Sequence, residues 1–292
     1  MISIEWCALV PFASSEVLLK QVFKCSGQQL KKHTLDRKWL MMPIAARQVV
    51  QLPLALVNAK EIWPWTDYSG VAVVAEDEEL LALHKPPGIH THPLHYEPVP
   101  NLVSWLAAAA PKLTLVNAQG MDRGCVWRLD RETSGLVLYA KTDEAYGRLR
   151  SHFSQVFRRK LYWAIVEGDP GTQTKLTHFL SPQGVKGERM KVGATGQTAV
   201  LDYETVMTEN GYSLVVVNLH SGLRHQIRVQ LAAIGHPIVG DTFYGGNAAE
   251  RLFLHCWRYE TETKTFSDPG AELFERFFDL HRLLQVLHDK FR

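Results

Sequence analysis

The segment VWRLDRETSGLVLYAK, residues 126–141, places an acidic side chain between two basic ones, directly before an apolar run. Asp130 lies between Arg128 and Arg131, and residues 135–140 read as a strand that is buried on both faces. A free aspartate has a pKa of about 3.9, so it needs no arginine in order to be ionised at neutral pH. A guanidinium becomes useful when a ligand covers the carboxylate and removes water. The pattern indicates either an ion pair that holds a loop or a carboxylate that reacts in a covered site.

A second polar cluster lies in the segment SGLRHQIR, residues 221–228. Arg228 comes one helical turn after Arg224 and three residues after His225. Two cations this close favour an anionic ligand or a carboxylate partner. The alternative is a solvated helix end, but cations at a helix N-terminus oppose the helix dipole.

A basic cluster precedes the strand KLYWAIVEG, residues 160–168. Arg158, Arg159 and Lys160 could hold phosphates while the ring of Tyr162 stacks on a base. The alternative is that Tyr162 belongs to the core.

Four histidines lie close together at His84, His90, His92 and His95. The run contains no acidic residue or cysteine at a familiar ligand spacing, so we expect no metal there.

The elements that must position these residues alternate irregularly, without the regular βαβ order of a doubly wound sheet. This favours an α+β fold with a largely antiparallel sheet. Pro64, Gly70 and two tryptophans in the segment KEIWPWTDYSG mark a junction, so we expect an N-terminal extension of uncertain role at 1–70 and a main domain at 71–292. Two strands are expected within 71–85, and single strands at 135–140, 160–168 and 212–222. Helices are expected at 101–110, 143–155, 224–235 and 271–291.

The composition is that of an ordinary globular protein, with 46% hydrophobic and 21% charged residues among 292. A net charge of +2 means that a polyanion must be met by a local basic patch. Four scattered cysteines predict reduced thiols. The N-terminus lacks a basic lead-in, and no apolar run approaches the roughly 20 residues of a membrane span. We therefore expect a cytoplasmic protein, without contact with a membrane, and a monomer.

Taken together, the motifs resemble those of the RluA-type pseudouridine synthases. RLDRETSG is similar to the signature of that family, and the other motifs follow the family's order between about residues 71 and 259. They are the opening motif AEDEELLALHKPPGIHTHP, the tyrosine strand KLYWAIVEG, the arginine motif SGLRHQIRVQLAAIGHPIVGDTFYGG and the closing strand LFLHCW.

The resemblance implies a mixed, largely antiparallel sheet with a central RNA-binding cleft. It also implies isomerisation of uridine to pseudouridine in ribosomal or transfer RNA, with no metal and no cofactor. Asp130 would be the catalytic aspartate, and Arg228 would pair with it although about a hundred residues separate them. Tyr162 would stack on the flipped uracil and take part in the final proton transfer. The residues expected to contact RNA are Arg128, Arg131, Arg158, Arg159, Lys160, Arg224 and His225.

The chain departs from the family pattern at three positions. Trp127 stands where the family usually has histidine, Leu223 where it usually has arginine, and Gln230 where histidine is common. Residues 1–70 do not match the small RNA-binding domain that many relatives carry. Two alternatives stay open: a non-catalytic RNA-binding or chaperone relative on the same scaffold, and a carboxylate-based hydrolase with Glu132 as the second acid.

Overall fold

The computed structural model of the chain describes residues 3–8, 10–23, 25–32, 36–53, 56, 70–93, 100–118, 120–185, 187–270 and 273–291. By its internal contacts the chain divides into two compact units. One is formed by Met1–Tyr68 with His92–Arg123, and the other by Ser69–Thr91 with Gly124–Arg292. Within the described residues, no helix combines the length and the apolar character that crossing a membrane requires.

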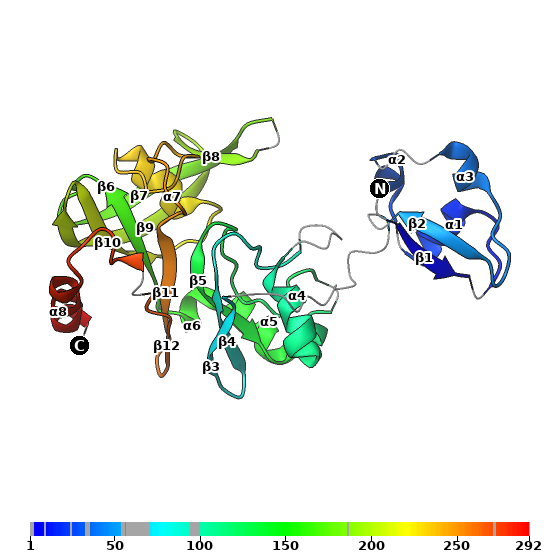
Figure 1. Cartoon of the computed structure of the whole chain (residues 1–292), viewed down its shortest axis with the longest axis horizontal. Coiled ribbons are helices and arrows are strands. Elements are labelled where there is room, and N and C mark those ends of the chain that lie inside the picture. The colour runs from blue at the N-terminus through cyan, green and yellow to red at the C-terminus, as the bar shows by residue number, and fades with distance from the viewer. Residues whose placement is uncertain are drawn as a thin grey trace. The chain divides into compact units, whose positions relative to one another are not determined.

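A mixed sheet forms the centre of the second unit (Figure 1). Its ten described strands include the path β3-β4-β5-β11-β6-β10-β9-β7-β8, and β12 pairs with β11. Among the described residues, neighbouring strands of this sheet are antiparallel, except that β5 and β11 are parallel. The predicted α+β class with a largely antiparallel sheet is confirmed. The strands are β3 (Ala72–Glu76), β4 (Leu80–Lys85), β5 (Ser134–Ala140), β6 (Arg159–Glu167), β7 (Gln173–Gln183), β8 (Arg189–Gly193), β9 (Gln197–Glu209), β10 (Tyr212–Leu219), β11 (Leu254–Glu260) and β12 (Thr265–Ser267).

Strand β11 lies between β5 and β6, although it comes from much later in the chain. His255 is level with Ser134 of β5, and Cys256 is level with Gly135 on one side and with Tyr162 of β6 on the other. A Cβ atom at position 135 would lie 2.2 Å from the carbonyl oxygen of Cys256, and φ there is 112°. Glycine is therefore required where the two strands meet.

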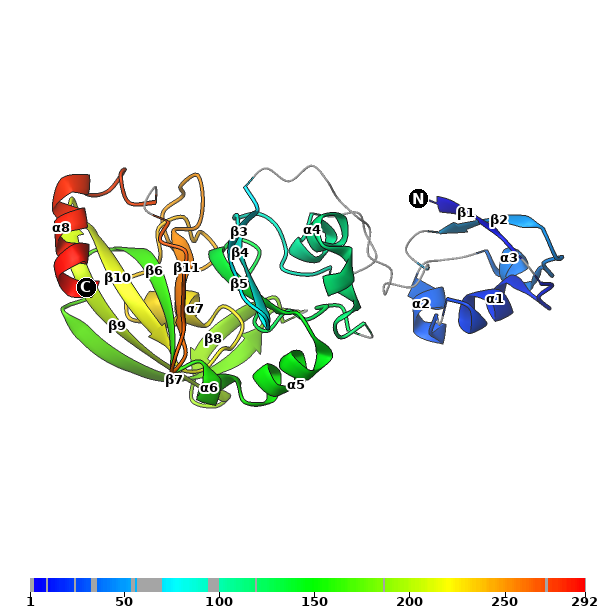
Figure 2. The ribbon, with the colours of Figure 1, turned by 90° about the horizontal axis from the view of Figure 1, so that it is seen from below.

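Helices α4 and α5 each begin at a residue whose side chain caps the first turn. The hydroxyl of Thr142 accepts a hydrogen bond from the amide of Ala145 at 3.1 Å, and the side chain of Asn101 accepts one from Ser104 at 3.0 Å. Helix α8 lies beside β9 (Figure 2). In the second unit the helices are α5 (Asp143–Ser151), α6 (Phe153–Val156), α7 (Gln226–Ala233) and α8 (Leu280–Phe291); in the first unit α4 (Leu102–Ala109) is followed by the 3-10 helix η2 (Pro111–Leu115).

The C-terminal segment corrects one prediction. A single helix is expected over 271–291, but α8 begins only at Leu280. Before it, the amides of Phe277 and Phe278 both donate to the carbonyl oxygen of Phe274, which gives tight turns. These turns bury Phe274 against Trp163 at a ring distance of 5.7 Å. Aromatic burial in several directions overrides the helical periodicity here.

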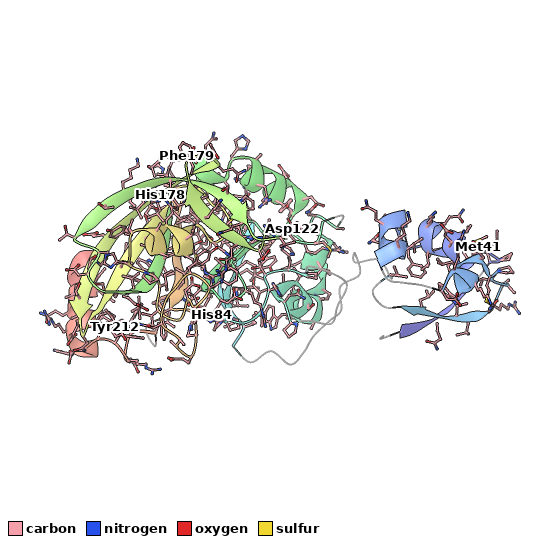
Figure 3. All side chains as sticks on the ribbon, turned by 90° about the horizontal axis from the view of Figure 1, so that it is seen from above. Met41, His84, Asp122, His178, Phe179 and Tyr212 are labelled. Atoms are coloured by element: carbon pink, nitrogen blue, oxygen red, sulfur yellow. The ribbon has the colours of Figure 1, made fainter. Side chains whose placement is uncertain are left out.

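The strands between β6 and β10 are absent from the sequence-based prediction. Along β9, buried and more exposed positions alternate over much of its length, so its apolar signal is weak. The successive residues His178 and Phe179 mark β7 in Figure 3, well apart from His84 on β4. Strands with one solvated face carry many polar residues, which hides them from a search for apolar runs.

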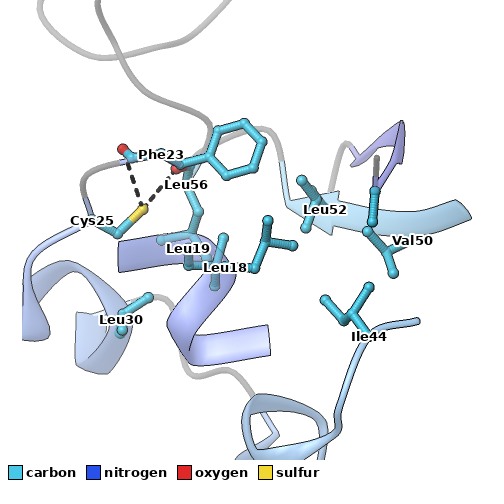
Figure 4. Packing of buried hydrophobic residues seen from close by; sticks show 10 residues of the cluster. Leu18, Leu19, Phe23, Cys25, Leu30, Ile44, Val50, Leu52 and Leu56 are labelled. Carbon is cyan, nitrogen blue, oxygen red and sulfur yellow. Dashed lines mark hydrogen bonds between the residues drawn. The ribbon is translucent and has the colours of Figure 1, made fainter. Parts of the chain in front are cut away.

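The first part of the chain forms a small mixed structure with its own core. Strand β1 (Ser3–Cys7) pairs antiparallel with β2 (Val49–Pro53), and helices α1 (Ser15–Gln21), α2 (Gly27–Lys32) and α3 (Arg37–Met41) come between them in sequence. Figure 4 shows the thiol of Cys25 donating to the carbonyl oxygen of Leu56, at 2.8 Å. The core holds Ala8, Leu18, Leu19, Phe23, Cys25, Leu30, Ile44, Val50, Leu52 and Leu56.

Candidate active site

A buried lysine holds the loop that carries Asp130 through hydrogen bonds to backbone carbonyl oxygens. The ammonium of Lys85, the last residue of β4, donates to the carbonyl oxygens of Pro86, Ile89 and Arg131 at 3.0, 2.9 and 3.0 Å. Lys85 is 0% exposed. Burial lowers its pKa to about 7, and the charge of Asp130 acts in the opposite direction. Three acceptors for three hydrogens match the charged form of the amine.

Two more residues fix the same loop. Nε of Arg131 donates to the carbonyl oxygen of Gly88 at 2.9 Å, and the amide of Gly88 donates to the carbonyl oxygen of Arg131 at 2.8 Å. The hydroxyl of Thr91 donates to the carbonyl of Leu129 at 3.0 Å and lies 3.1 Å from the amide of Leu129. These contacts hold Arg131 to the loop, and its predicted phosphate contact stays a prediction.

Arg228 lies beside Asp130, as the sequence predicts. It belongs to the first turn of α7, and its Nη1 atom is 3.7 Å from Oδ2 of Asp130 and 3.6 Å from Oε2 of Glu132. Its Nε and Nη2 atoms donate to Oδ2 and Oδ1 of Asp241 at 2.7 and 2.8 Å. Asp241 is 1% exposed, and this two-bond contact fixes the plane of the guanidinium. Asp241, which the sequence analysis does not single out, thus leaves Nη1 facing Asp130.

Burial disfavours ionisation of the Asp130 carboxyl group, and the cations near it favour ionisation. Its side chain is 25% exposed. Burial raises its pKa above the usual range, the guanidinium of Arg228 opposes that rise, and Glu132 adds to it. Lys85 acts in the same direction as Arg228. The surroundings therefore set the charge of this group by opposing effects, as is common for side chains that react.

Tyr162 lies in the middle of β6 and is 3% exposed. Burial raises the pKa of its hydroxyl well above the usual value, with Cys256 as the next cause and Asp130 as a smaller one. Burial also raises the pKa of the Cys256 thiol to about 12. Tyr162 thus carries a protonated hydroxyl at neutral pH. Its predicted stacking role stays a prediction.

The side chains of the basic cluster at the start of β6 differ in burial. Arg158 forms a salt bridge with Glu262, and Nη1 of Arg159 is 3.5 Å from Oε2 of Glu260. Both arginines are exposed. Lys160 instead is 4% exposed, and burial lowers its pKa to about 8. The structure does not bring the three side chains to one face.

The three other residues expected to contact RNA lie on the loops around Asp130. Arg128 and Arg224 are exposed, and Arg224 donates a hydrogen bond to the carbonyl oxygen of Gly187 in the turn between β7 and β8. His225 is half-buried, with Nε2 4.0 Å from Oδ2 of Asp130. Arg224 and His225 therefore lie on the loop that leads into α7.

The three departures from the family pattern each have a structural setting. Trp127 stacks on Phe153 with ring centroids 4.3 Å apart, and a Cβ atom at Gly222 would lie 1.7 Å from its indole. Leu223 packs against an apolar cluster beside α7. The amide of Gln230 donates to a carbonyl oxygen of β9 at 3.3 Å. All three positions make contacts within the protein.

A series of hydrogen bonds among buried polar groups begins at Ser134, the first residue of β5. Nδ1 of His255 is 2.8 Å from the hydroxyl of Ser134, which also accepts a hydrogen bond from Arg251. Nε2 of His255 donates to the carbonyl oxygen of Asp268 at 2.7 Å, and the carboxylate of Asp268 is 2.6 Å from Nδ1 of His84. Ser134 and His255 are fully buried, so this chain supports the strand after Asp130.

Comparison with known proteins identifies the family of the chain. Residues 79–233, which include Asp130, Tyr162 and Arg228, match the family model described as RNA pseudouridylate synthase. The chain belongs to this family. The synthase family match covers more than half of the chain, and it confirms the resemblance to pseudouridine synthases.

Several curated members of this synthase family are similar to the chain. A ribosomal large subunit pseudouridine synthase D of Zymomonas mobilis is 36% identical over 177 residues, which cover 59% of this chain and 55% of that protein. The protein of the same name from Pseudomonas aeruginosa is 33% identical over 209 residues, covering 71% and 63%. An uncharacterized RNA pseudouridine synthase of Mycobacterium bovis is 31% identical over 231 residues, covering 76% and 74%. The chain spans about half to two thirds of the length of several of these relatives.

One solved structure has the same fold. Human RNA pseudouridylate synthase domain containing 1 superposes with a TM-score of 0.57 at 22% identity, over 75% of this chain and 94% of that one. The pseudouridine synthase fold of the sheet is therefore shared.

Proposed function

We propose that this chain isomerises uridine to pseudouridine in ribosomal or transfer RNA, with residues 71–292 as its catalytic domain. The observation that carries the proposal is the meeting of Asp130 with the fixed guanidinium of Arg228, at 3.7 Å, in a chain of the synthase family. The names of two relatives, ribosomal large subunit pseudouridine synthase D, favour ribosomal RNA. Such RNA also favours the cytoplasm as the place of action.

Asp130 is the proposed catalytic residue. Its carboxylate attacks or deprotonates the target nucleotide while the glycosidic bond breaks, and the uracil then turns and rejoins the ribose through carbon. RNA that covers the site removes water, and the attraction between charges about 4 Å apart then becomes worth roughly 4 kcal/mol at an effective dielectric near 20. Because Asp241 orients Arg228, this attraction is available without rearrangement of the guanidinium.

Tyr162 is the proposed partner of the flipped uracil. Stacking on a base is worth roughly 1–3 kcal/mol. We assign the hydroxyl to the final proton transfer, in which the carbon that has rejoined the ribose loses its proton and the freed ring nitrogen gains one. Since Tyr162 is 3% exposed, the proposal requires that RNA binding uncovers its ring. Flipping the uridine costs a few kcal/mol, which stacking and phosphate contacts offset.

The phosphate contacts are assigned to exposed cations. Arg128, Arg131 and Arg224 lie on the loops around Asp130, and Arg158 and Arg159 lie at the start of β6. We propose no metal and no cofactor in the reaction.

The test is Asp130→Asn, which keeps the volume of the side chain and removes its nucleophile. Transcribed ribosomal and transfer RNAs are incubated with each protein, and pseudouridines are mapped. Asp130→Asn should form no product while it keeps RNA affinity and melting temperature, and a variant that turns over at a comparable rate would refute the role of Asp130. RNA binding by the wild type without product would favour a chaperone. Release of free base would favour a hydrolase with Glu132 as second acid.

Two substitutions separate the roles of Tyr162. Tyr162→Phe keeps the ring, and Tyr162→Ala removes it. If the hydroxyl moves the proton, Tyr162→Phe should consume substrate and stall before the finished pseudouridine, whereas Tyr162→Ala should bind and react poorly. Single-turnover assays on one defined RNA distinguish these outcomes. A Tyr162→Ala variant equal to the wild type would place the residue in the core alone.

A further inference from the structure

His225 has a backbone conformation that the surroundings must impose. It precedes α7 with φ of 53°, in the left-handed region that side chains other than glycine rarely adopt. A residue in this region costs free energy and persists only where its neighbours fix it, which is common at functional sites. The conformation places the ring with Nε2 4.0 Å from Oδ2 of Asp130.

The other ring nitrogen of His225 is held by a relay of hydrogen bonds. The amide of Met190 donates to the hydroxyl oxygen of Tyr244 at 2.9 Å, and the same hydroxyl lies 2.9 Å from Nδ1 of His225. Among the described residues, Nδ1 is the acceptor that this hydroxyl can reach. We assign the proton of this hydroxyl to Nδ1, and the proton of the neutral ring then lies on Nε2, the atom that faces Asp130.

The charges around His225 favour the uncharged ring. Burial and the guanidiniums of Arg228 and Arg224 together lower its pKa to about 4, while Glu132 and Asp241 act the other way. The ring is thus neutral at pH 7. A neutral imidazole offers a hydrogen-bond donor to a carboxylate but no charge to a phosphate.

Two donors face one oxygen of Asp130. Nη1 of Arg228 and Nε2 of His225 lie 3.7 and 4.0 Å from Oδ2, just beyond hydrogen-bond distance. Such contacts commonly tighten when the substrate binds. The contact recorded for each donor is with Oδ2 rather than Oδ1.

We propose that His225 is a positioning residue: with its proton fixed on Nε2 by Tyr244 and Met190, it holds Oδ2 of Asp130 together with Arg228 and presents Oδ1 to the uridine. This inference rests on the proposed function. It makes Tyr244 a second positioning residue, which acts through the histidine.

The first test is kinetic. His225→Leu removes the donor, and misplacement of Asp130 should lower the single-turnover rate about 10- to 100-fold, while RNA affinity stays close to that of the wild type. His225→Gln carries an amide nitrogen near the position of Nε2 and should restore most of the rate. The matched control is His220→Gln, since His220 pairs with Asp202. A full rate in His225→Leu, or equal losses in the Leu and Gln variants, would overturn the proposal.

The second test is independent of catalysis. Long-range proton–nitrogen NMR on protein with labelled histidine, assigned by comparison with His225→Gln, should show a proton on Nε2 from pH 8 down to about pH 5. In Tyr244→Phe, Nδ1 loses its hydrogen-bond donor and can take a proton. The charged form of the His225 ring should therefore appear at a higher pH than in the wild type. A proton on Nδ1, or a charged wild-type ring at pH 7, would refute the relay.

These readouts separate the two proposals. A wild-type protein that forms no pseudouridine would defeat the proposed function, whereas NMR would still decide the state of His225.

Discussion

Lys85 and Lys160 are buried lysines in strands of one sheet, and their surroundings differ. The ammonium of Lys85 meets three carbonyl oxygens at 2.9–3.0 Å. That of Lys160 lies 4.7 Å from the ring of Trp127 and 5.1 Å from that of Phe153. Burial lowers the two pKa values to about 7 and about 8.

The difference teaches that equal burial does not mean an equal role. A charge removed from water needs hydrogen-bond partners to recover the cost of desolvation, and Lys85 has them. The attraction between a cation and an aromatic ring returns about 0.5–2 kcal/mol, which offsets less of that cost. We therefore expect the two lysines to respond differently to the same substitution.

Lys85→Met should have the largest effect. It leaves three carbonyl oxygens without their donor, and the loss of a buried charged partner costs roughly 3–5 kcal/mol. The Asp130 loop should lose its position, so pseudouridine formation should fall with the free energy of unfolding. Urea unfolding and single-turnover assays measure both. Lys160→Met is the matched control, and equal losses in the two variants would contradict the comparison.

Gly222→Ala should have the next largest effect, in the surroundings of Lys160. Its new methyl group would overlap the indole of Trp127, and overpacking of this kind costs about 1–3 kcal/mol. Trp127→Ala should remove the clash, so that Gly222→Ala adds almost nothing in that background. Thermal unfolding of the two single variants and the double variant measures the coupling. Additive costs would mean that the indole is not the obstacle.

Lys160→Met should not lower the free energy of unfolding at pH 7, because the ring contacts offset only part of the cost of burying the charge. The pH dependence is more informative, because the pKa of lysine falls from an ordinary value of about 10.4 to about 8 on folding. Between these values the unfolded chain holds the proton and the folded chain does not, so the contribution of Lys160 to stability increases with pH. The stability of the wild type relative to Lys160→Met should therefore rise between about pH 8 and pH 10.4 and stay constant below. A difference that is constant across this interval would show that the pKa of Lys160 is unchanged.

The smallest effects concern the salt dependence of RNA affinity. Each phosphate contact contributes about 0.7–0.9 to the slope of log affinity against log salt. Arg158→Ala and Arg159→Ala should each reduce the slope by up to that amount, and Lys160→Met should leave it unchanged because its ammonium is buried. Titrations between about 50 and 200 mM salt measure the slopes. A reduced slope in Lys160→Met would place that lysine on RNA.

The separation of Lys160 from Arg159 could be predicted from the sequence. Successive side chains in a strand point to opposite faces, so Arg159 and Lys160 cannot share a surface once 159–167 is read as a strand. Reading the three basic residues as one cluster ignored this alternation. The strand itself and the adjacency of Arg228 to Asp130 were predicted, because the motifs are specific.

The roles of Lys85 and Asp241 could not be predicted from the sequence, for a different reason. The function of Lys85 depends on the backbone carbonyls of Ile89 and Arg131, and no side chain signals a backbone acceptor 46 residues away. Asp241 stands in the quoted arginine motif, but its two hydrogen bonds to Arg228 follow from the turn after α7. The relay to His225 likewise begins at a backbone amide, that of Met190.

The placement of β11 between β5 and β6 has a consequence for the order of folding. It separates these strands by two strand spacings, about 10 Å, and so sets the distance between the strand after Asp130 and the strand of Tyr162. Yet residues 254–260 leave the ribosome nearly a hundred residues after β6, and contacts between distant segments form slowly. A nascent chain that ends before Leu254 already contains Asp130, Tyr162 and Arg228 but lacks the strand that spaces the first two.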